Sequence, residues 1–160
     1  MHPWSEAITK GINPPITSLD ALQTALNSPK TILCLSSGSS SNKDVVVAAT
    51  ETADVIFRIK HQWLKEGRIC RAGIVFSGTV ESVWHVPNAI LLSQNATTSY
   101  RVAWSALLHG RRIRYDIVET LAPSFHTRGK SGAGMTNGAA MLALAVTIKP
   151  QQLLIAGIDL

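Results

Sequence analysis

The stretch TILCLSSGSSSNKDVVVAATE, residues 31–51, sets the fold class of this chain. Its apolar run stops at Leu35, six small residues fill positions 36–41, and an apolar pattern with helical spacing begins after Asn42. Such a sequence predicts a buried strand, a tight loop and a helix. We expect Asn42 to cap that helix, and Asp44 suits the positive charge of its first turn.

The same alternation continues along the chain. Apolar runs predict further strands in residues 53–59, 72–77, 88–93, 112–119 and 152–160. Helical patterns predict helices in residues 18–26, 97–110 and 135–150, with a long loop in residues 120–134. This order predicts an α/β fold with a mainly parallel sheet covered by helices on both faces. We expect an irregular segment with one short helix in residues 1–30 and a single domain in residues 31–160.

The composition is that of a folded domain. Hydrophobic residues make up 46% of the chain and charged residues only 16%, which excludes a disordered protein. No run of 18 apolar residues is present, and the first ten residues lack the pattern of a signal peptide. Cys34 and Cys70 lie in apolar, strand-like surroundings and are expected to be reduced thiols. We therefore expect a cytoplasmic protein.

The chain is basic, with 15 Lys and Arg against 10 Asp and Glu. Two groups of bases stand out, Arg111 with Arg112 and Arg114, and Arg128 with Lys130. Ordinary solvation explains such groups as well as an anionic ligand or an anionic membrane surface does. Nucleic acid is not an expected partner, because no binding motif is present and aromatic residues are only 6%. Peripheral contact with a membrane stays open.

The small-residue loop at positions 36–41 suggests where a ligand would bind. Ligands of open parallel sheets bind beyond the carboxyl ends of the strands. Small residues let a ligand approach the backbone, and N–H groups before a helix attract phosphate. The loop is thus either an anion or nucleotide cradle or a flexible polar turn. It has neither the dinucleotide-binding nor the P-loop pattern, and GKS at 129–131 lacks the first P-loop glycine because Ser124 stands there.

Metal chemistry is not expected from the residue spacing. The five histidines are His2, His61, His85, His109 and His126, and none forms a metal-ligand spacing with another. Neither cysteine has a CxxC partner, and no Asp-x-Asp pair is present. The sequence therefore predicts no zinc or magnesium site and no cofactor.

Two further stretches place polar residues at predicted strand ends or helix starts. The first stretch is residues 54–63, DVIFRIKHQW, in which a polar cluster lies at the end of a predicted strand. This cluster is either the edge of a binding site or a solvent-exposed connection. The cluster consists of Arg58, Lys60, His61 and Gln62. The helix in residues 135–150 has no charge before position 149 and is expected to be buried on most sides. Its polar start would direct backbone N–H groups at whatever lies before it.

These stretches, in this order, resemble bacterial sialyltransferases of the family that includes the Campylobacter lipooligosaccharide enzymes. LSSGSSS, residues 35–41, is similar to the family's AGNGPSL-like loop, and DVIFRIKHQ, residues 54–62, to its DVFRCNQ-like strand end. TNGAAMLALAVTIKPQQLLIAGIDL, residues 136–160, is similar to a TSGVYM…ALGYKEIYLSGIDF-like segment, without a gap from Thr136 to Gly157. The resemblance covers residues 31–160, and the third block is the most specific.

The resemblance implies a Rossmann-like, three-layer α/β/α nucleotide-binding domain that uses CMP-sialic acid without a metal. The implied reaction moves a sugar from a CMP-activated donor to a hydroxyl of a glycan acceptor, which is lipooligosaccharide-like in this family. A base would take the proton of that hydroxyl, and donors near the phosphate would stabilise the leaving group. Carried over by position, the nucleotide-binding residues are Ser37, Gly38, Ser40, Lys60, Ser77, Thr136, Asn137, Gly138, Gly157 and Asp159.

The chain departs from the family at several of these positions. Ser37, Lys60 and Ser77 stand where the family has asparagines. A lysine pairs a phosphate as a point charge, without the readout of an amide. The family's catalytic histidine and phosphate-binding tyrosines follow the GID strand, so the resemblance implies that this chain ends before them and transfers no sugar alone. No catalytic residue is assigned; His61 and His126 are the histidines nearest to predicted strand ends or helix starts.

Two other functions stay open. An archaeal pterin pyrophosphokinase-like family shares the small-residue loop and a GxDL-like strand end, and its pyrophosphoryl transfer needs magnesium. The second alternative is a non-catalytic nucleotide-binding module. The sequence does not fix the oligomeric state, so a homo-oligomer also stays open.

Overall fold

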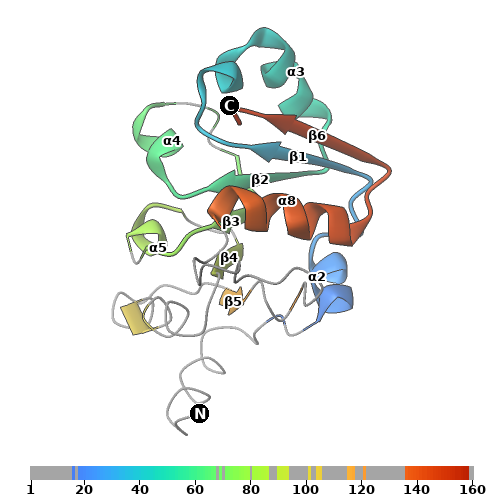
Figure 1. Cartoon of the computed structure of the whole chain (residues 1–160), viewed down its shortest axis with the longest axis vertical. Coiled ribbons are helices and arrows are strands. Elements are labelled where there is room, and N and C mark those ends of the chain that lie inside the picture. The colour runs from blue at the N-terminus through green and yellow to red at the C-terminus, as the bar shows by residue number, and fades with distance from the viewer. Residues whose placement is uncertain are drawn as a thin grey trace, which may run out of the picture.

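The computed structural model describes residues 16, 18–67, 69, 71–79, 81–86, 90–93, 101, 104–105, 115–117, 121 and 136–158. In this part of the chain, six strands form one all-parallel sheet in the order β5-β4-β3-β2-β1-β6 (Figure 1). The predicted α/β fold with a parallel sheet is thus confirmed. The strands are β1 (Thr31–Leu35), β2 (Val55–Ile59), β3 (Ile74–Phe76), β4 (Ile90–Ser93), β5 (Tyr115–Ile117) and β6 (Gln152–Ala156).

Helices cover both faces of this sheet. The described helices are α2 (Leu19–Ala25), the 3₁₀ helix η1 (Ser39–Asn42), α3 (Asp44–Thr52), α4 (Gln62–Lys65), α5 (Ser82–His85) and α8 (Asn137–Ile148). Helix α8 packs across β1, β2 and β3 on one face, and α3 packs against β1 on the other (Figure 1). The arrangement is the three-layer one that is typical of Rossmann-like folds.

Side chains that alternate along the strands build a core on each face of the sheet. On one face, Ile32, Cys34 and Phe57 belong to the same buried cluster as Met141 and Leu144 of α8. The cluster on the other face consists of Leu33, Leu35, Val46, Ala53 and Ile56. Burial of this apolar surface is the main force that holds the layers together. Six of the 12 residues of α8 are buried, which agrees with the extensive burial expected for a helix without charged residues.

The side chain of Asp54, just before β2, links the amino end of β2 to that of β1 by hydrogen bonds. Its Oδ2 accepts hydrogen bonds from the backbone N–H groups of Thr31 and Lys30, both at 2.8 Å. These bonds, the one from Thr31 first, hold the pKa of Asp54 below its usual value. The register between the strands places Leu35 opposite Arg58, so neighbouring strands reach a common carboxyl edge.

The helix after β1 begins differently from the prediction. Asn42 is the last residue of η1 and does not cap α3, so the predicted cap was wrong. Lys43 holds the cap position without a side-chain hydrogen bond, and Asp44 lies in the first turn as expected. The reason is local bonding by a serine. Both the N–H and the hydroxyl of Ser41 donate to the carbonyl of Gly38, which winds the loop into a 3₁₀ turn.

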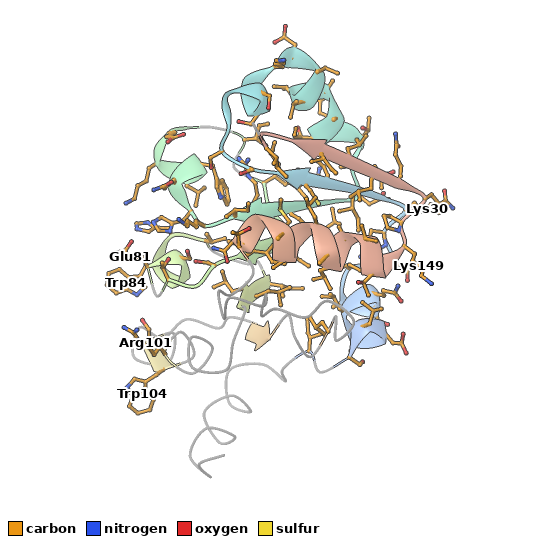
Figure 2. The ribbon with its side chains drawn as sticks, in the orientation of Figure 1. Lys30, Glu81, Trp84, Arg101, Trp104 and Lys149 are labelled. Carbon is orange, nitrogen blue, oxygen red and sulfur yellow. The ribbon has the colours of Figure 1, made fainter. Side chains whose placement is uncertain are left out.

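Two predicted elements lie mostly outside the described residues. Of the predicted helix 97–110, residues 101 and 104–105 are described, and they are helical. Of the predicted loop 120–134, only Leu121 is described, and it is helical, so the loop prediction is wrong at this residue. Trp84 on α5 donates from its Nε1 to the Oγ of Ser105 (3.3 Å). Trp84 projects outward beside α5, and Trp104 projects outward from the segment that carries Arg101 (Figure 2). No helix in the described part of the chain is long and apolar enough to cross a bilayer.

Candidate functional site

The serine loop closes onto the end of β6 at the carboxyl edge of the sheet. The N–H of Ser36 donates to the carbonyl of Ala156 (3.0 Å), and the N–H of Gly38 donates to the carbonyl of Gly157 (2.9 Å). In return, the N–H of Gly157 donates to the Oγ of Ser40 (3.0 Å), a residue 117 positions away in the sequence. The loop after β1 and the end of β6 thus lie at the same edge, as a parallel sheet predicts, and they are in contact because β6 pairs with β1.

Gly157 lies where only glycine fits. Its φ is 71°, in the left-handed region that favours glycine. A Cβ at this position would lie 2.5 Å from the backbone oxygen of Ser36. The N–H of Gly38 is engaged by the Gly157 carbonyl, so in this structure it does not point at a ligand. Both glycines therefore fasten the loop, and their contact with a nucleotide stays a prediction.

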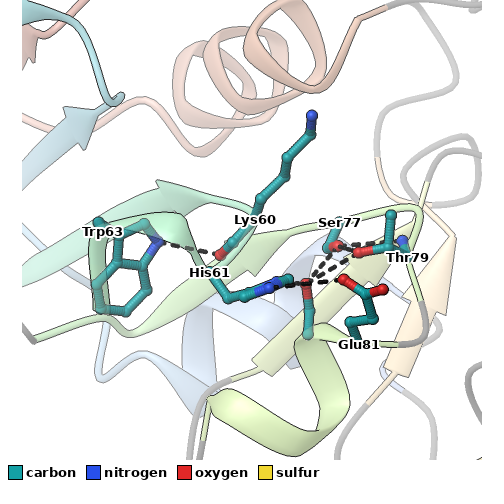
Figure 3. A network of polar contacts seen from close by, with 7 residues as sticks. Lys60, His61, Trp63, Ser77, Thr79 and Glu81 are labelled. Atoms are coloured by element: carbon teal, nitrogen blue, oxygen red, sulfur yellow. Dashed lines mark hydrogen bonds and ion pairs between the residues drawn. The ribbon is translucent and has the colours of Figure 1, made fainter. Parts of the chain in front are cut away.

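Lys60 follows β2 in a left-handed backbone conformation (φ 55°), which is uncommon for a residue with a side chain. Its N–H donates to the carbonyl of Phe76 at the end of β3 (2.9 Å), and its carbonyl accepts from the Nε1 of Trp63 (3.0 Å). Its exposed side chain extends toward the ribbon of α8 (Figure 3). Unusual backbone conformations that the surroundings enforce cluster at functional sites. Lys60 is therefore the leading candidate for a ligand contact.

Arg58 belongs to the same predicted polar cluster but has a structural position. It is 1% exposed, and its Nη2 donates to the carbonyl of Ile69 (2.6 Å). Its guanidinium carbon lies 4.5 Å from the centre of the Trp63 ring, a cation–π contact. Because Trp63 also bonds the carbonyl of Lys60, Arg58 and Trp63 support the turn that presents the lysine.

The start of α8 lies beside the end of β2. Thr136 caps this helix, since its Oγ1 accepts from the N–H of Ala139 (3.2 Å). A Cβ built on Gly138 would lie 3.6 Å from the Cδ1 of Ile59, which is ordinary van der Waals contact. The backbone of Gly138 is thus close to the last residue of β2. A helix start carries partial positive charge, so it and Lys60 favour an anion at the same edge.

A network of hydroxyl groups, two of them from buried serines, lies beside this edge after β3 (Figure 3). The Oγ of Ser77 is 2.7 Å from the Oγ of Ser82 and 3.1 Å from the Oγ1 of Thr79. Ser82 in turn lies 3.0 Å from the Nδ1 of His61. Ser77 is 2% exposed and Ser82 is fully buried. The hydroxyl of Ser77 is therefore turned into the protein, and its predicted contact with a nucleotide stays a prediction.

His61 connects this network to charged neighbours. Its ring stacks on that of His85 with 4.8 Å between centroids, and its Nε2 lies 3.8 Å from the Oε2 of Glu81. Burial, followed by the charges of His85 and Lys65, lowers the pKa of His61, while Glu81 acts in the opposite direction. His61 is 5% exposed, and this burial favours the neutral form of its ring.

The order Ser82, His61 and Glu81 has the elements of a nucleophile with its base. A nucleophile must reach its substrate, however, and the side chain of Ser82 has no exposed surface. The hydroxyl also bonds Ser77 and Thr79. These residues therefore join the end of β2 to the loop after β3, and they do not form a hydrolytic site.

The chain matches no protein-family model, and no curated protein matches it. Within the described residues, no group of three or more His, Cys, Asp or Glu side chains could hold a metal ion.

Most of the predicted nucleotide-binding residues lie along one edge of the sheet. The described ones follow β1, β2, β3 and β6 or start α8; they are Ser37, Gly38, Ser40, Lys60, Ser77, Thr136, Asn137, Gly138 and Gly157. Asp159 and His126 lie outside the described residues. The predicted polar cluster is divided, because Arg58 and His61 are buried whereas Lys60 and Gln62 are exposed.

Sequence reasoning missed the partners that position these residues, namely Trp63, Ser82 and His85. Helices α4 and α5 have four residues each, too few to show a helical period. The only signal was the polar cluster itself, whose neighbours in space lie 21 positions further along the chain.

The position of His61 predicts that the folded protein loses stability as the pH falls. Its pKa is lower in the folded state than the ordinary value of 6.5, so the unfolded chain binds more protons. The free energy of unfolding should therefore decrease as the pH falls from about 7.5 to 5.5, around the ordinary histidine pKa. Urea denaturation at several pH values measures this slope.

His61→Gln keeps a polar side chain but cannot take up the proton, so its stability should change less over the same pH range. His85→Gln is the matched control; it removes one charge that repels the protonated ring, and its slope should lie between the other two. Equal slopes for the unmodified protein and His61→Gln would show that another group carries the pH dependence.

Proposed function

We propose that this chain is the nucleotide-binding part of a sialyltransferase-like glycosyltransferase. In this proposal it binds a CMP-activated sugar, which is transferred to a hydroxyl of a lipooligosaccharide-like glycan. The observation that carries the proposal is the convergence of the serine loop, an exposed Lys60 and the start of α8 at the carboxyl edge of a parallel sheet. The similarity of three sequence blocks supports CMP over other nucleotides.

The phosphate of a CMP-sugar fits the electrostatics of this edge. Lys60 brings a full positive charge, and α8 brings the partial charge of a helix of 12 residues. When the bond between the anomeric carbon and the phosphate oxygen breaks, negative charge develops on CMP. Positive groups that are already in place stabilise that charge without having to reorganise. Such preorganised electrostatic stabilisation is usually the largest single contribution to catalysis.

Polar side chains on either side of Lys60 suit the nucleoside. Ser37 and Ser40 on the loop offer hydroxyls for the ribose, and Thr136 and Asn137 at the start of α8 offer polar groups for the base or the phosphate.

The proposal assigns no catalytic base. The acceptor hydroxyl must lose its proton as the new glycosidic bond forms, and general base help contributes typically ~100- to 10,000-fold. His61 does not fit this role, because it is buried and hydrogen-bonded to Ser82.

The net charge of +5 suits an anionic membrane surface that carries the glycan.

Calorimetric titration with CMP, CTP, ATP and GTP, with and without magnesium, tests the proposal. Cytidine nucleotides should bind more tightly than adenine or guanine nucleotides, and magnesium should not be required. Binding of ATP that needs magnesium, without binding of CMP, would instead favour pyrophosphoryl transfer. Equal affinity for all four nucleotides would favour a non-selective binding module and would count against the glycosyltransferase.

A further inference from the structure

Strand β6 lies at one edge of the sheet, and no strand in the described part of the chain pairs with its outer side (Figure 1). Its inner side is fully paired with β1 from Gln152 to Ala156. The N–H of Gln152 donates to the carbonyl of Lys30, and the carbonyl of Ala156 accepts from the N–H of Ser36. Because backbone groups alternate along a strand, the N–H and C=O groups of Leu153 and Ile155 face outward.

This edge lacks the usual devices that prevent strands from pairing. Edges are normally protected by charged side chains, proline or bulges. From Gln151 to Ile158 the chain has no charged residue and no proline, and the pairing with β1 is regular. Ile155 is 54% exposed, and so is Val146 on α8. The opposite edge differs, since β5 has only three residues and includes Asp116.

We propose that a second copy of this chain pairs with β6, antiparallel, about a two-fold axis at Leu154. The outward residues Leu153 and Ile155 are two positions apart. In this register, Leu153 of one copy therefore lies opposite Ile155 of the other and exchanges both backbone hydrogen bonds with it. The reciprocal pair does the same, so every outward donor meets an acceptor.

No charge repulsion opposes this pairing, because β6 has no charged residue. Like charges that face each other across strands are unfavourable, and in a two-fold pair the residue on the axis always faces its own copy. The facing pairs here are Gln152 with Ala156, Leu153 with Ile155, and Leu154 with its own copy, all uncharged. The contact closes on itself, so it gives a dimer and not a fibre. A second copy is therefore the partner that this edge fits.

The proposed dimer leaves both candidate sites open. Antiparallel pairing turns the two carboxyl edges in opposite directions, so the two serine loops lie at opposite edges of the joined sheet. Dimerisation and nucleotide binding are therefore expected to be independent. Failure of one proposal is then distinguishable from failure of the other.

Sedimentation velocity over a range of concentrations tests the dimer. A contact through one short strand of each copy belongs to the class of weak protein–protein interfaces, which bury less than about 1,200 Å². The measurement should therefore extend to high protein concentration. Ile155→Lys should weaken the dimer at least ~10-fold, because it removes an apolar contact and adds an edge charge. Gln62→Lys is the control, with the same lysine on α4, which follows β2. Only monomer at about 1 mM, or equal weakening by both variants, would overturn the proposal.

Engineered cysteines test the register. Non-hydrogen-bonded antiparallel pairs have Cα atoms about 4.5 Å apart, within the ~4.4–6.8 Å range of disulfides. With Cys70→Ser as background, Leu154→Cys should form an intermolecular disulfide under mild oxidation. Leu153→Cys should not, because its own copy lies diagonally at about 7–8 Å. Burial raises the pKa of the Cys34 thiol to about 12, so it does not compete. Equal cross-linking of both variants, or none, would contradict the register.

Discussion

Replacing Gly157 with alanine should lower the free energy of unfolding by about 3 kcal/mol, since left-handed backbone costs ~1–2 kcal/mol and overpacking another ~1–3. The added Cβ would lie 2.5 Å from the backbone oxygen of Ser36 and 3.0 Å from the Cβ of Ser41. A backbone oxygen in a paired strand end cannot move aside as the tip of a flexible side chain can. The loop would therefore separate from β6.

Two other glycines are matched controls for this substitution. Gly67 has a φ of 63° but open space around its Cβ position, so Gly67→Ala should cost only the backbone term, about 1 kcal/mol. Gly138 has neither problem, and in a helix Gly138→Ala should be neutral or stabilising by up to ~1 kcal/mol. Urea denaturation gives all three values. If Gly157→Ala is no worse than Gly67→Ala, the close approach of loop and strand is incorrect.

Replacing Lys60 with glycine should weaken binding of CMP by roughly 10- to 100-fold, which corresponds to the loss of one charged hydrogen bond. The same change should preserve the fold or stabilise it slightly, because glycine adopts the left-handed conformation of Lys60 without strain. Binding and stability are thus expected to change in opposite directions. A loss of affinity could not then be attributed to unfolding.

Lys65→Gln is the matched control for this experiment. It removes the same charge from the exposed end of α4, and salt largely screens charges that do not contact the ligand. CMP affinity of Lys65→Gln should stay within about twofold of the unmodified protein. If Lys60→Gly binds CMP as tightly as the unmodified protein does, Lys60 does not contact the phosphate.

The layers of the fold could be predicted from the sequence because each element has a strong local signal. The apolar runs of β1 and β2 and the uncharged stretch of α8 are long enough to show their structure. The serine loop and Gly157 were expected at the same edge of the sheet, since parallel strands end at one edge, but their direct contact was not predicted. The position of β6 next to β1 could not be predicted, because strand order depends on contacts between distant segments.

The environment of each polar residue was the part that the sequence did not reveal. Arg58, Lys60 and His61 are close in the sequence, yet two are buried and only Lys60 is exposed. Their separation depends on Trp63, which covers the guanidinium and bonds the carbonyl of Lys60. The capping of α3 was misjudged for a similar reason, since the hydroxyl of Ser41 bonds locally and shifts the start of the helix.

The most direct test of the proposed nucleotide site is the set of backbone amide signals that move when CMP is added to ¹⁵N-labelled protein. The largest shifts should come from residues 36–41, from Lys60 and from residues 136–138, which surround the carboxyl edge. Signals of β4 and of the amino ends of β1 and β2 should stay in place. Saturable shifts confined to other parts of the chain, or no shifts at millimolar CMP, would contradict the account.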